Sequence, residues 1–134
     1  MRLIRLAPLA LLALQTQAAE GFDPVKDIAI TVHGGILSVT VSRGAHLKVR
    51  TFKCVLGSQG ELSLGPLPPA SGVDEAGDPI WRGTVQVPLG GAQLEDPAKL
   101  TVTYQPCTEG PEGVCYLPQK RRLSVAASEL NPRP

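Results

Sequence analysis

Glycine and proline interrupt this chain so often that long helices have no room to form. The sequence has 14 Gly and 13 Pro in 134 residues, which is about double the average usage. Such frequent breakers favour short strands joined by turns. With 43% hydrophobic and 19% charged residues, the chain is globular rather than disordered. We therefore predict one compact domain built from strands.

Alternation of apolar and polar residues locates about seven predicted strands. They cover 27–33, 36–42, 46–56, 61–64, 80–89, 99–105 and the residues around 121–125. Gly34-Gly35 indicates a two-residue hairpin turn between the first two. The apolar face of the third strand changes near Thr51-Phe52, so we expect a bulge there or burial of both faces. Residues 65–79 form a long irregular loop between strands.

This succession of short strands and turns predicts the fold class. We expect an all-β, immunoglobulin-like antiparallel β-sandwich, with a small barrel as the alternative. No convincing helix is predicted, and the last residues, 131–134, are expected to be frayed.

The N-terminal residues have the layout of a secretory signal. Arg2 and Arg5 precede an apolar run from Leu6 to Leu14, and small residues follow before Glu20. This run is too short for a transmembrane helix, which needs ~20 apolar residues; an uncleaved amphipathic anchor is the alternative. We predict a signal peptide at 1–19 and a single domain at 20–134 that is periplasmic or secreted, with no stable membrane insertion.

Several classes of function lack support in the sequence. A formal net charge of +1 gives no broad basic surface for nucleic acid, and aromatic residues are only 4% of the chain. No phosphate-binding loop, nucleophile elbow or haem-attachment motif is present. His33 and His46 lack metal-ligand spacing, and we expect His46 at the surface at the start of a strand. We therefore predict neither a metal nor a cofactor.

The chain contains three cysteines. Cys107 and Cys115 flank a predicted hairpin tip at 110–113, and antiparallel strands bring such residues within disulfide reach. Cys54 lies among apolar residues of a predicted strand. The sequence favours a Cys107–Cys115 bond and a reduced Cys54 in the core, although three cysteines also admit other pairings.

Two functions suit a disulfide at a hairpin tip. As a structural bond, closing this ring contributes about 2.5 kcal/mol in the chain-entropy model. As a redox bond, it lies open to attack by the thiolate of another protein. No predicted helix N-terminus activates either sulfur, so the partner would bring the activated thiol. Both interpretations stay open at this point.

A resemblance to a known family bears on this choice. Tyr104-Gln105-Pro106-Cys107 followed by Val114-Cys115-Tyr116-Leu117-Pro118 resembles the segment Y-Q-x-C … C-Y-x-P. That segment marks the N-terminal periplasmic domain of the thiol:disulfide interchange protein DsbD. More weakly, residues 42–48 and 80–89 resemble strands of the same domain.

The resemblance implies a thiol-disulfide exchange function. The family domain is an immunoglobulin-like sandwich whose cysteine pair carries electrons from a membrane-linked thioredoxin-like domain to periplasmic oxidoreductases. By this resemblance Cys107 and Cys115 are the redox pair, and Cys115 forms the mixed disulfide. A membrane domain and a thioredoxin-like domain do not fit in 134 residues, so thioredoxin-like proteins or a membrane thiol reductase would act in trans.

The chain also departs from the family pattern. The family shields its disulfide with an aromatic cap loop, whereas residues 73–77 here contain no aromatic. The loop between the cysteines is also enlarged by residues 110–113. The candidate shielding residues are Asp74, Glu75, Trp81, Tyr104 and Tyr116. Residues 120–122 are interpreted as a solvated strand edge or as a docking patch for an acidic partner. The alternative function is a non-catalytic exported β-sandwich that binds a partner, with a structural disulfide.

Overall fold

The computed structural model describes residues 21–57, 60–61, 64, 66–89 and 96–130. The predicted signal peptide at 1–19 and the tail at 131–134 lie outside these residues. Within them the chain forms ten strands, and all their pairings are antiparallel. This confirms the prediction of an all-β, immunoglobulin-like sandwich.

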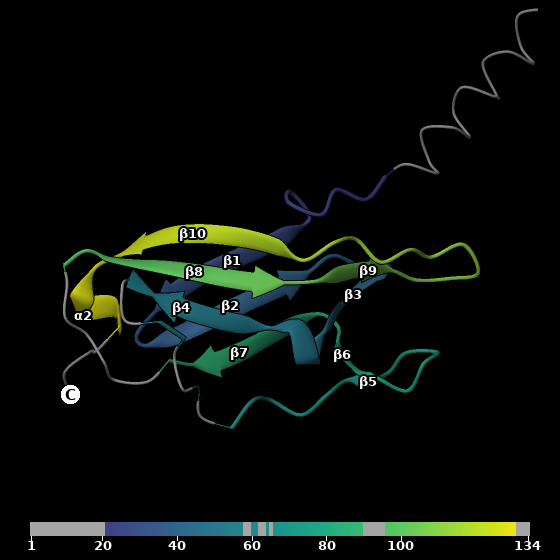
Figure 1. The fold of residues 1–134 in the computed structure, drawn as a ribbon, viewed down its shortest axis with the longest axis horizontal. Helices are drawn as coiled ribbons and strands as arrows, with labels where there is room; N and C mark the ends of the chain where they lie inside the picture. The colour runs from purple at the N-terminus through teal and green to yellow at the C-terminus, as the bar shows by residue number, and fades with distance from the viewer. Residues whose placement is uncertain (1–20, 58–59, 62–63, 65, 90–95, 131–134) are drawn as a thin grey trace, which may run out of the picture.

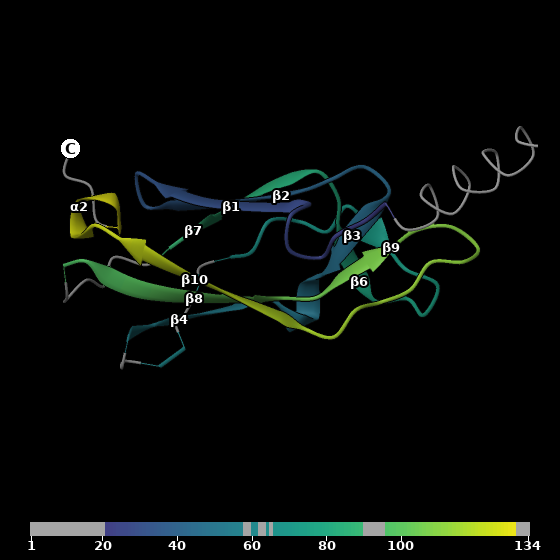
Figure 2. The ribbon, with the colours of Figure 1, turned by 90° about the horizontal axis from the view of Figure 1, so that it is seen from above.

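Two three-stranded sheets make the body of the sandwich, and Figure 2 shows them as separate layers. One contains β1 (Ile28–His33), β2 (Ile36–Val41) and β7 (Thr84–Pro88). The other contains β10 (Gln119–Val125), β8 (Ala98–Tyr104) and β4 (Lys53–Leu56). Alternate apolar side chains of both sheets form the core. They include Leu37, Val39 and Val87 from the first sheet and Cys54, Leu100 and Val102 from the second.

The first hairpin matches its prediction. His33 pairs with Ile36, and Gly34 and Gly35 between them have φ values of 60° and 79°. A two-residue turn with two positive φ angles follows the natural twist of the strands, and glycine adopts it without steric cost. The Gly-Gly pair therefore sets the register of β1 against β2.

A third sheet lies at one end of the sandwich, at the right in Figures 1 and 2. Its order is β5 (Gly72–Val73), β6 (Pro79–Trp81), β3 (Ala45–Lys48) and β9 (Pro106–Thr108). We call it the end sheet. Some of its strands continue along the chain into strands of the sandwich.

Two predicted strands are each divided between sheets. The segment 46–56 is broken by a 3-10 turn, η2 (Val49–Thr51), so the chain leaves the end sheet and enters the sandwich as β4. The change of apolar face near Thr51-Phe52 marks this transfer, so the expected bulge or two-sided burial is wrong. The segment 80–89 divides at Gly83, whose φ is 70°. These divisions, together with β5 and β9, add four strands to the predicted seven. Of the predicted strand 61–64, Glu61 forms only an isolated bridge with Val55, and residues 62–63 lie outside the described residues, which leaves ten strands.

The C-terminal described residues contain a feature that the sequence did not predict. A single short helix, α2 (Ala127–Leu130), follows β10 and buries Leu130. The Glu129 side chain accepts a hydrogen bond from the amide of Gly34 (2.9 Å), which joins the helix to the first hairpin. Among the described residues, no helix is long and apolar enough to cross a membrane.

Cys54 lies in the core, as predicted. Its side chain has no solvent exposure and is not in a disulfide. Burial, with a smaller contribution from the negative charge of Glu61, raises the pKa of this thiol to about 12. Because the thiolate is the reactive form and the side chain is buried, we expect Cys54 to be unreactive at neutral pH.

Candidate functional site

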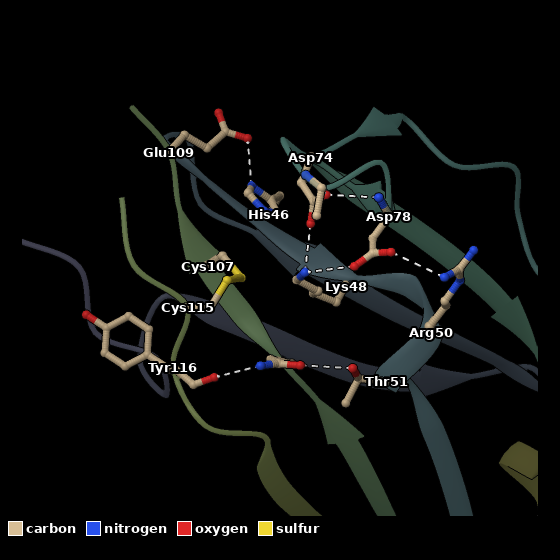
Figure 3. Close-up of polar contacts among 12 residues, drawn as sticks. His46, Lys48, Arg50, Thr51, Asp74, Asp78, Cys107, Glu109, Cys115 and Tyr116 are labelled. Carbon is tan, nitrogen blue, oxygen red and sulfur yellow. Dashed lines mark hydrogen bonds and ion pairs between the residues drawn. A yellow bond between two sulfur atoms is a disulfide. The ribbon is translucent and has the colours of Figure 1, made fainter. Parts of the chain in front are cut away.

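The disulfide joins Cys107 on β9 to Cys115 on the returning segment (Figure 3). The amide of Thr108 donates to the carbonyl of Val114 (2.8 Å), and the amide of Tyr116 donates to that of Pro106 (2.9 Å). The two cysteines therefore face each other at a non-hydrogen-bonded position, where opposing side chains approach most closely. Their α carbons are 3.9 Å apart. The pairing favoured by the sequence is thus confirmed.

Glycine permits the turn between the two cysteines. Gly110 has a φ of 102°, a region that other residues rarely adopt. A Cβ atom at Gly113 would lie 2.2 Å from the carbonyl oxygen of Thr108, so no side chain fits there. Gly110 and Gly113, two of the residues that enlarge this loop, therefore allow it to close against β9.

The two sulfur-bearing residues differ sharply in exposure. Cys107 is only 1% exposed because it lies within the end sheet, next to β3. Cys115 is exposed, because its segment meets β9 only through a single bridge at the cysteines. A protein thiolate approaching from solvent therefore meets Cys115 first.

The outer face of the end sheet forms the floor of an open pocket beside the disulfide. Along β3, Ala45 and Leu47 point into the core, so His46 and Lys48 point to the opposite face. His46 lies directly across from Cys107. The pocket has a volume of about 640 Å³, and its lining includes His46, Asp74, Glu75, Arg82, Cys107 and Cys115.

Residues 73–78, which we call the cap loop, form one wall of this pocket. Asp74 organises the loop, since one oxygen of its carboxylate accepts hydrogen bonds from the amides of Ala76 and Asp78, both at 2.9 Å. The other oxygen accepts from Nζ of Lys48 at 2.7 Å. Lys48 also bonds Asp78 at 3.2 Å, as does Arg50 at the same distance. Ion pairs therefore fasten the cap loop to β3 and η2 (Figure 3).

This fastening shifts the ionisation of both partners. The hydrogen bond from Lys48, followed by those from the amides of Asp78 and Ala76, lowers the pKa of Asp74 to about 2. Hydrogen bonds to Asp74 and Asp78 raise the pKa of Lys48. Both groups are therefore charged throughout the neutral range.

Lys48→Met is expected to loosen the cap loop. The variant loses both ion pairs of Nζ. Amide hydrogen exchange at Ala76 and Asp78 should therefore accelerate about fivefold, which corresponds to the upper end of the free energies measured for partly exposed ion pairs. Lys99→Met is the matched control, because Lys99 is exposed at the far end of β8. Equal protection in both variants would contradict a fastening role for Lys48.

Acid should loosen the cap loop in the unaltered protein. The folded pKa of Asp74, about 2, lies below the value of about 3.9 for an unfolded aspartate. The stabilisation is therefore complete above about pH 4 and is lost as the pH falls through about 2. Protection factors, which are corrected for the intrinsic pH dependence of exchange, should decline over this interval.

A second ionic group lies on the other side of the pocket. Nδ1 of His46 is 3.0 Å from Oε2 of Glu109, and Nε of Arg82 donates to the same oxygen. Burial raises the pKa of Glu109, but the hydrogen bonds from Arg82 and His46 outweigh it, so the net shift is downward. His46 is only 7% exposed. Its predicted surface position is wrong, because β3 is an inner strand of the end sheet and Glu109 folds over the imidazole.

The candidate shielding residues lie in three different places. Asp74 and Glu75 line the pocket. Tyr116 is half-buried, with its ring 5.7 Å from that of Phe22, while its carbonyl accepts a hydrogen bond from Gln105. Trp81 and Tyr104 are 0% and 1% exposed and belong to the core instead.

Trp81 and Tyr104 have structural partners of their own. The ring of Trp81 packs edge-on against Phe52, with centroids 5.2 Å apart, and its Nε1 donates to the carbonyl of Pro68. The hydroxyl of Tyr104 donates to the carbonyl of Pro24 and accepts from Arg121. These contacts account for both residues without a role at the disulfide.

The interpretation of residues 120–122 as one docking patch is wrong for its central residue. Arg121 turns inward and donates to the carbonyls of Ile28 (3.1 Å) and Val25 (2.7 Å). Only Lys120 and Arg122 are exposed. As predicted for an edge, β10 is the outermost strand of its sheet.

Sequence reasoning missed much of the pocket and its fastening, including His46, Lys48, Ile80 and Arg82. The parity of β3 was the available signal, since His46 and Lys48 flank the apolar Leu47. In the described ranges, no three His, Cys, Asp or Glu side chains are grouped as metal ligands would be.

Comparisons with known proteins agree with this geometry. The model of the family "Thiol:disulfide interchange protein DsbD, N-terminal" matches residues 25–127. The crystal structure of the Neisseria meningitidis DsbD N-terminal domain in the reduced form is similar in fold, with a TM-score of 0.61 and 21% identity. The similarity covers 81% of this chain and 92% of that one. No curated protein matches significantly. The chain therefore belongs to the family of N-terminal domains of the thiol:disulfide interchange protein DsbD.

Proposed function

We propose that this domain carries reducing equivalents between thiol proteins through its Cys107–Cys115 pair. The observation that carries the proposal is the asymmetry of the bond: Cys115 is exposed beside an open pocket, while Cys107 is buried behind it. A purely structural bond gains nothing from such access. Exchange with another protein requires it.

The chemistry begins at the exposed sulfur. A thiolate of the partner attacks Sγ of Cys115, a new bond forms between those two sulfurs, and Cys107 leaves with the electron pair of the broken bond. The second thiol of the partner then loses its proton and attacks the partner's first sulfur, which releases Cys115 as a thiolate. The domain gains two electrons and two protons, and the partner becomes a disulfide. The reverse sequence reduces an acceptor.

Apolar residues around Cys115 support a protein as the partner. Val73, Val114 and Leu117 are 63%, 55% and 81% exposed, and the first two line the pocket. Exposed apolar side chains near a reactive group are typical of a surface that another protein covers. We assign the partners to thioredoxin-like proteins or a membrane thiol reductase acting in trans, in the periplasm after cleavage of the signal peptide.

The reduction potential of the pair tests this function. Equilibration with thiol buffers of known potential, followed by alkylation and mass measurement, should give a value above about −300 mV, where exchange partners operate. A value far below about −300 mV would identify a structural bond and leave the alternative, a non-catalytic binding module. The Cys107→Ser/Cys115→Ser variant is the control, since its alkylation should not respond to the buffer.

A further inference from the structure

We propose that His46 exchanges a proton with Cys107 during disulfide exchange, with Glu109 holding the imidazole in position. This inference rests on the proposed function and concerns the buried half of the same bond. It begins from a difficulty that the geometry creates: attack at the exposed Cys115 expels Cys107 as a thiolate where it is only 1% exposed. Burial disfavours a charged sulfur, so a nearby proton donor assists the step.

His46 meets the requirement of proximity. It lies directly opposite Cys107 across the β3–β9 pairing, and opposing residues point to the same face with their β carbons about 4.5–5.5 Å apart. Both residues line the pocket. Figure 3 shows the imidazole between Glu109 and the disulfide.

His46 also has suitable chemistry. Among the described residues that line the pocket, it is the only one of a type that commonly gains and loses a proton near neutral pH. A carboxylate 3.0 Å from Nδ1 selects the tautomer with a proton on that atom. Nε2 is then the atom that takes up and releases the exchanged proton.

Two charged groups hold the imidazole in place. The carboxylate of Glu109 contacts Nδ1 of His46, and Arg82 bonds the same carboxylate oxygen. The cap loop contributes two charged residues to the pocket lining, Asp74 and Glu75, and Lys48 of β3 lies next to Asp74. Lys48 and Asp74 are paired at 2.7 Å, so they largely neutralise each other.

The proton transfer completes the balance of the exchange. As the partner thiolate bonds to Cys115, the bond to Cys107 breaks, and the Cys107 thiolate takes the proton from Nε2 of the imidazolium. Water then protonates the neutral imidazole again. In the reverse direction, neutral His46 accepts the proton of the Cys107 thiol, and the resulting thiolate attacks Cys115 in the mixed disulfide and releases the acceptor.

The test is the pH profile of reduction by dithiothreitol, which needs no protein partner. Rates are measured from pH 5 to pH 8 and divided by the thiolate fraction of the reagent. The corrected rate constant of the unaltered domain should fall with rising pH through one single-proton inflection. His46→Asn should be flat and, at the acidic end, slower by at least about tenfold, the low end for general acid catalysis.

The chain offers a matched control. His33 is also paired with a glutamate, Glu129 of α2 at 3.3 Å, but its side chain is 90% exposed. Figure 1 shows α2 at the opposite end of the molecule from the end sheet. His33→Asn should retain the full inflection and rate. An inflection that survives in His46→Asn, or a flat profile in the unaltered domain, overturns the role of His46.

A second variant guards against failure of His46→Asn to fold, which circular dichroism would reveal. Glu109→Gln keeps the imidazole but removes the charge beside it, so the inflection should move to lower pH. An unmoved inflection overturns the positioning role of Glu109. The reduction potential of the disulfide is measured separately. A potential far below about −300 mV, together with the expected pH profile of reduction, would reject the carrier function but not the role of His46.

Discussion

Cys107→Ser should trap the domain in a stable mixed disulfide with a thiol partner, whereas Cys115→Ser should trap almost none. In the first variant the exposed Cys115 still reacts, but no second sulfur remains beside it to displace the partner. In the second, the remaining sulfur is only 1% exposed and lies within the end sheet. The expected contrast is close to all-or-none.

The experiment uses each variant with a thioredoxin-like protein that lacks its own resolving cysteine, offered in disulfide-linked form with a coloured thiol leaving group. Release of the leaving group and non-reducing electrophoresis report the adduct. Cys54→Ser is the control, because the Cys54 thiol is buried with a pKa raised to about 12 and should contribute nothing. Equal trapping by both single variants would show that the exposure difference does not direct the attack.

Trp81→Ala should cost about 3–5 kcal/mol in the free energy of unfolding, the usual range for truncating a buried aromatic. Trp81 has no solvent exposure, packs against Phe52 and donates a hydrogen bond to Pro68. The variant therefore loses apolar burial, leaves a cavity and removes the donor to a carbonyl. Urea unfolding followed by far-ultraviolet circular dichroism measures the loss.

This result would separate a core role for Trp81 from a shielding role. If Trp81 only shielded the disulfide, its truncation would accelerate reduction of the bond and leave the stability of the domain almost unchanged. Val73→Ala is the matched control within the pocket wall, since Val73 is 63% exposed; its expected change in stability is below about 0.5 kcal/mol. If Trp81→Ala also changed the free energy of unfolding by less than about 0.5 kcal/mol, that result would contradict the packing of Trp81 in the core.

Sequence patterns predict one part of the site, the disulfide, but not the pocket beside it. The disulfide could be predicted because Cys107 and Cys115 are close in sequence and flank turn residues, so local geometry suffices. The pocket could not, because His46 comes from β3, Arg82 follows β6, and Asp74 lies in a loop between strands. Their meeting depends on pairings between distant segments.

The sequence by itself determined the all-β class, the Gly34-Gly35 hairpin and the cysteine pair, because strand alternation and tight turns act over a few residues. Only the tertiary structure decided that 46–56 and 80–89 each divide between two sheets, and that His46 is buried beside Cys107. The physical reason is that period-two alternation specifies which side chains share a face of a strand but not which sheet that strand joins. That choice follows from long-range pairing and from the core that the assembled sheets enclose.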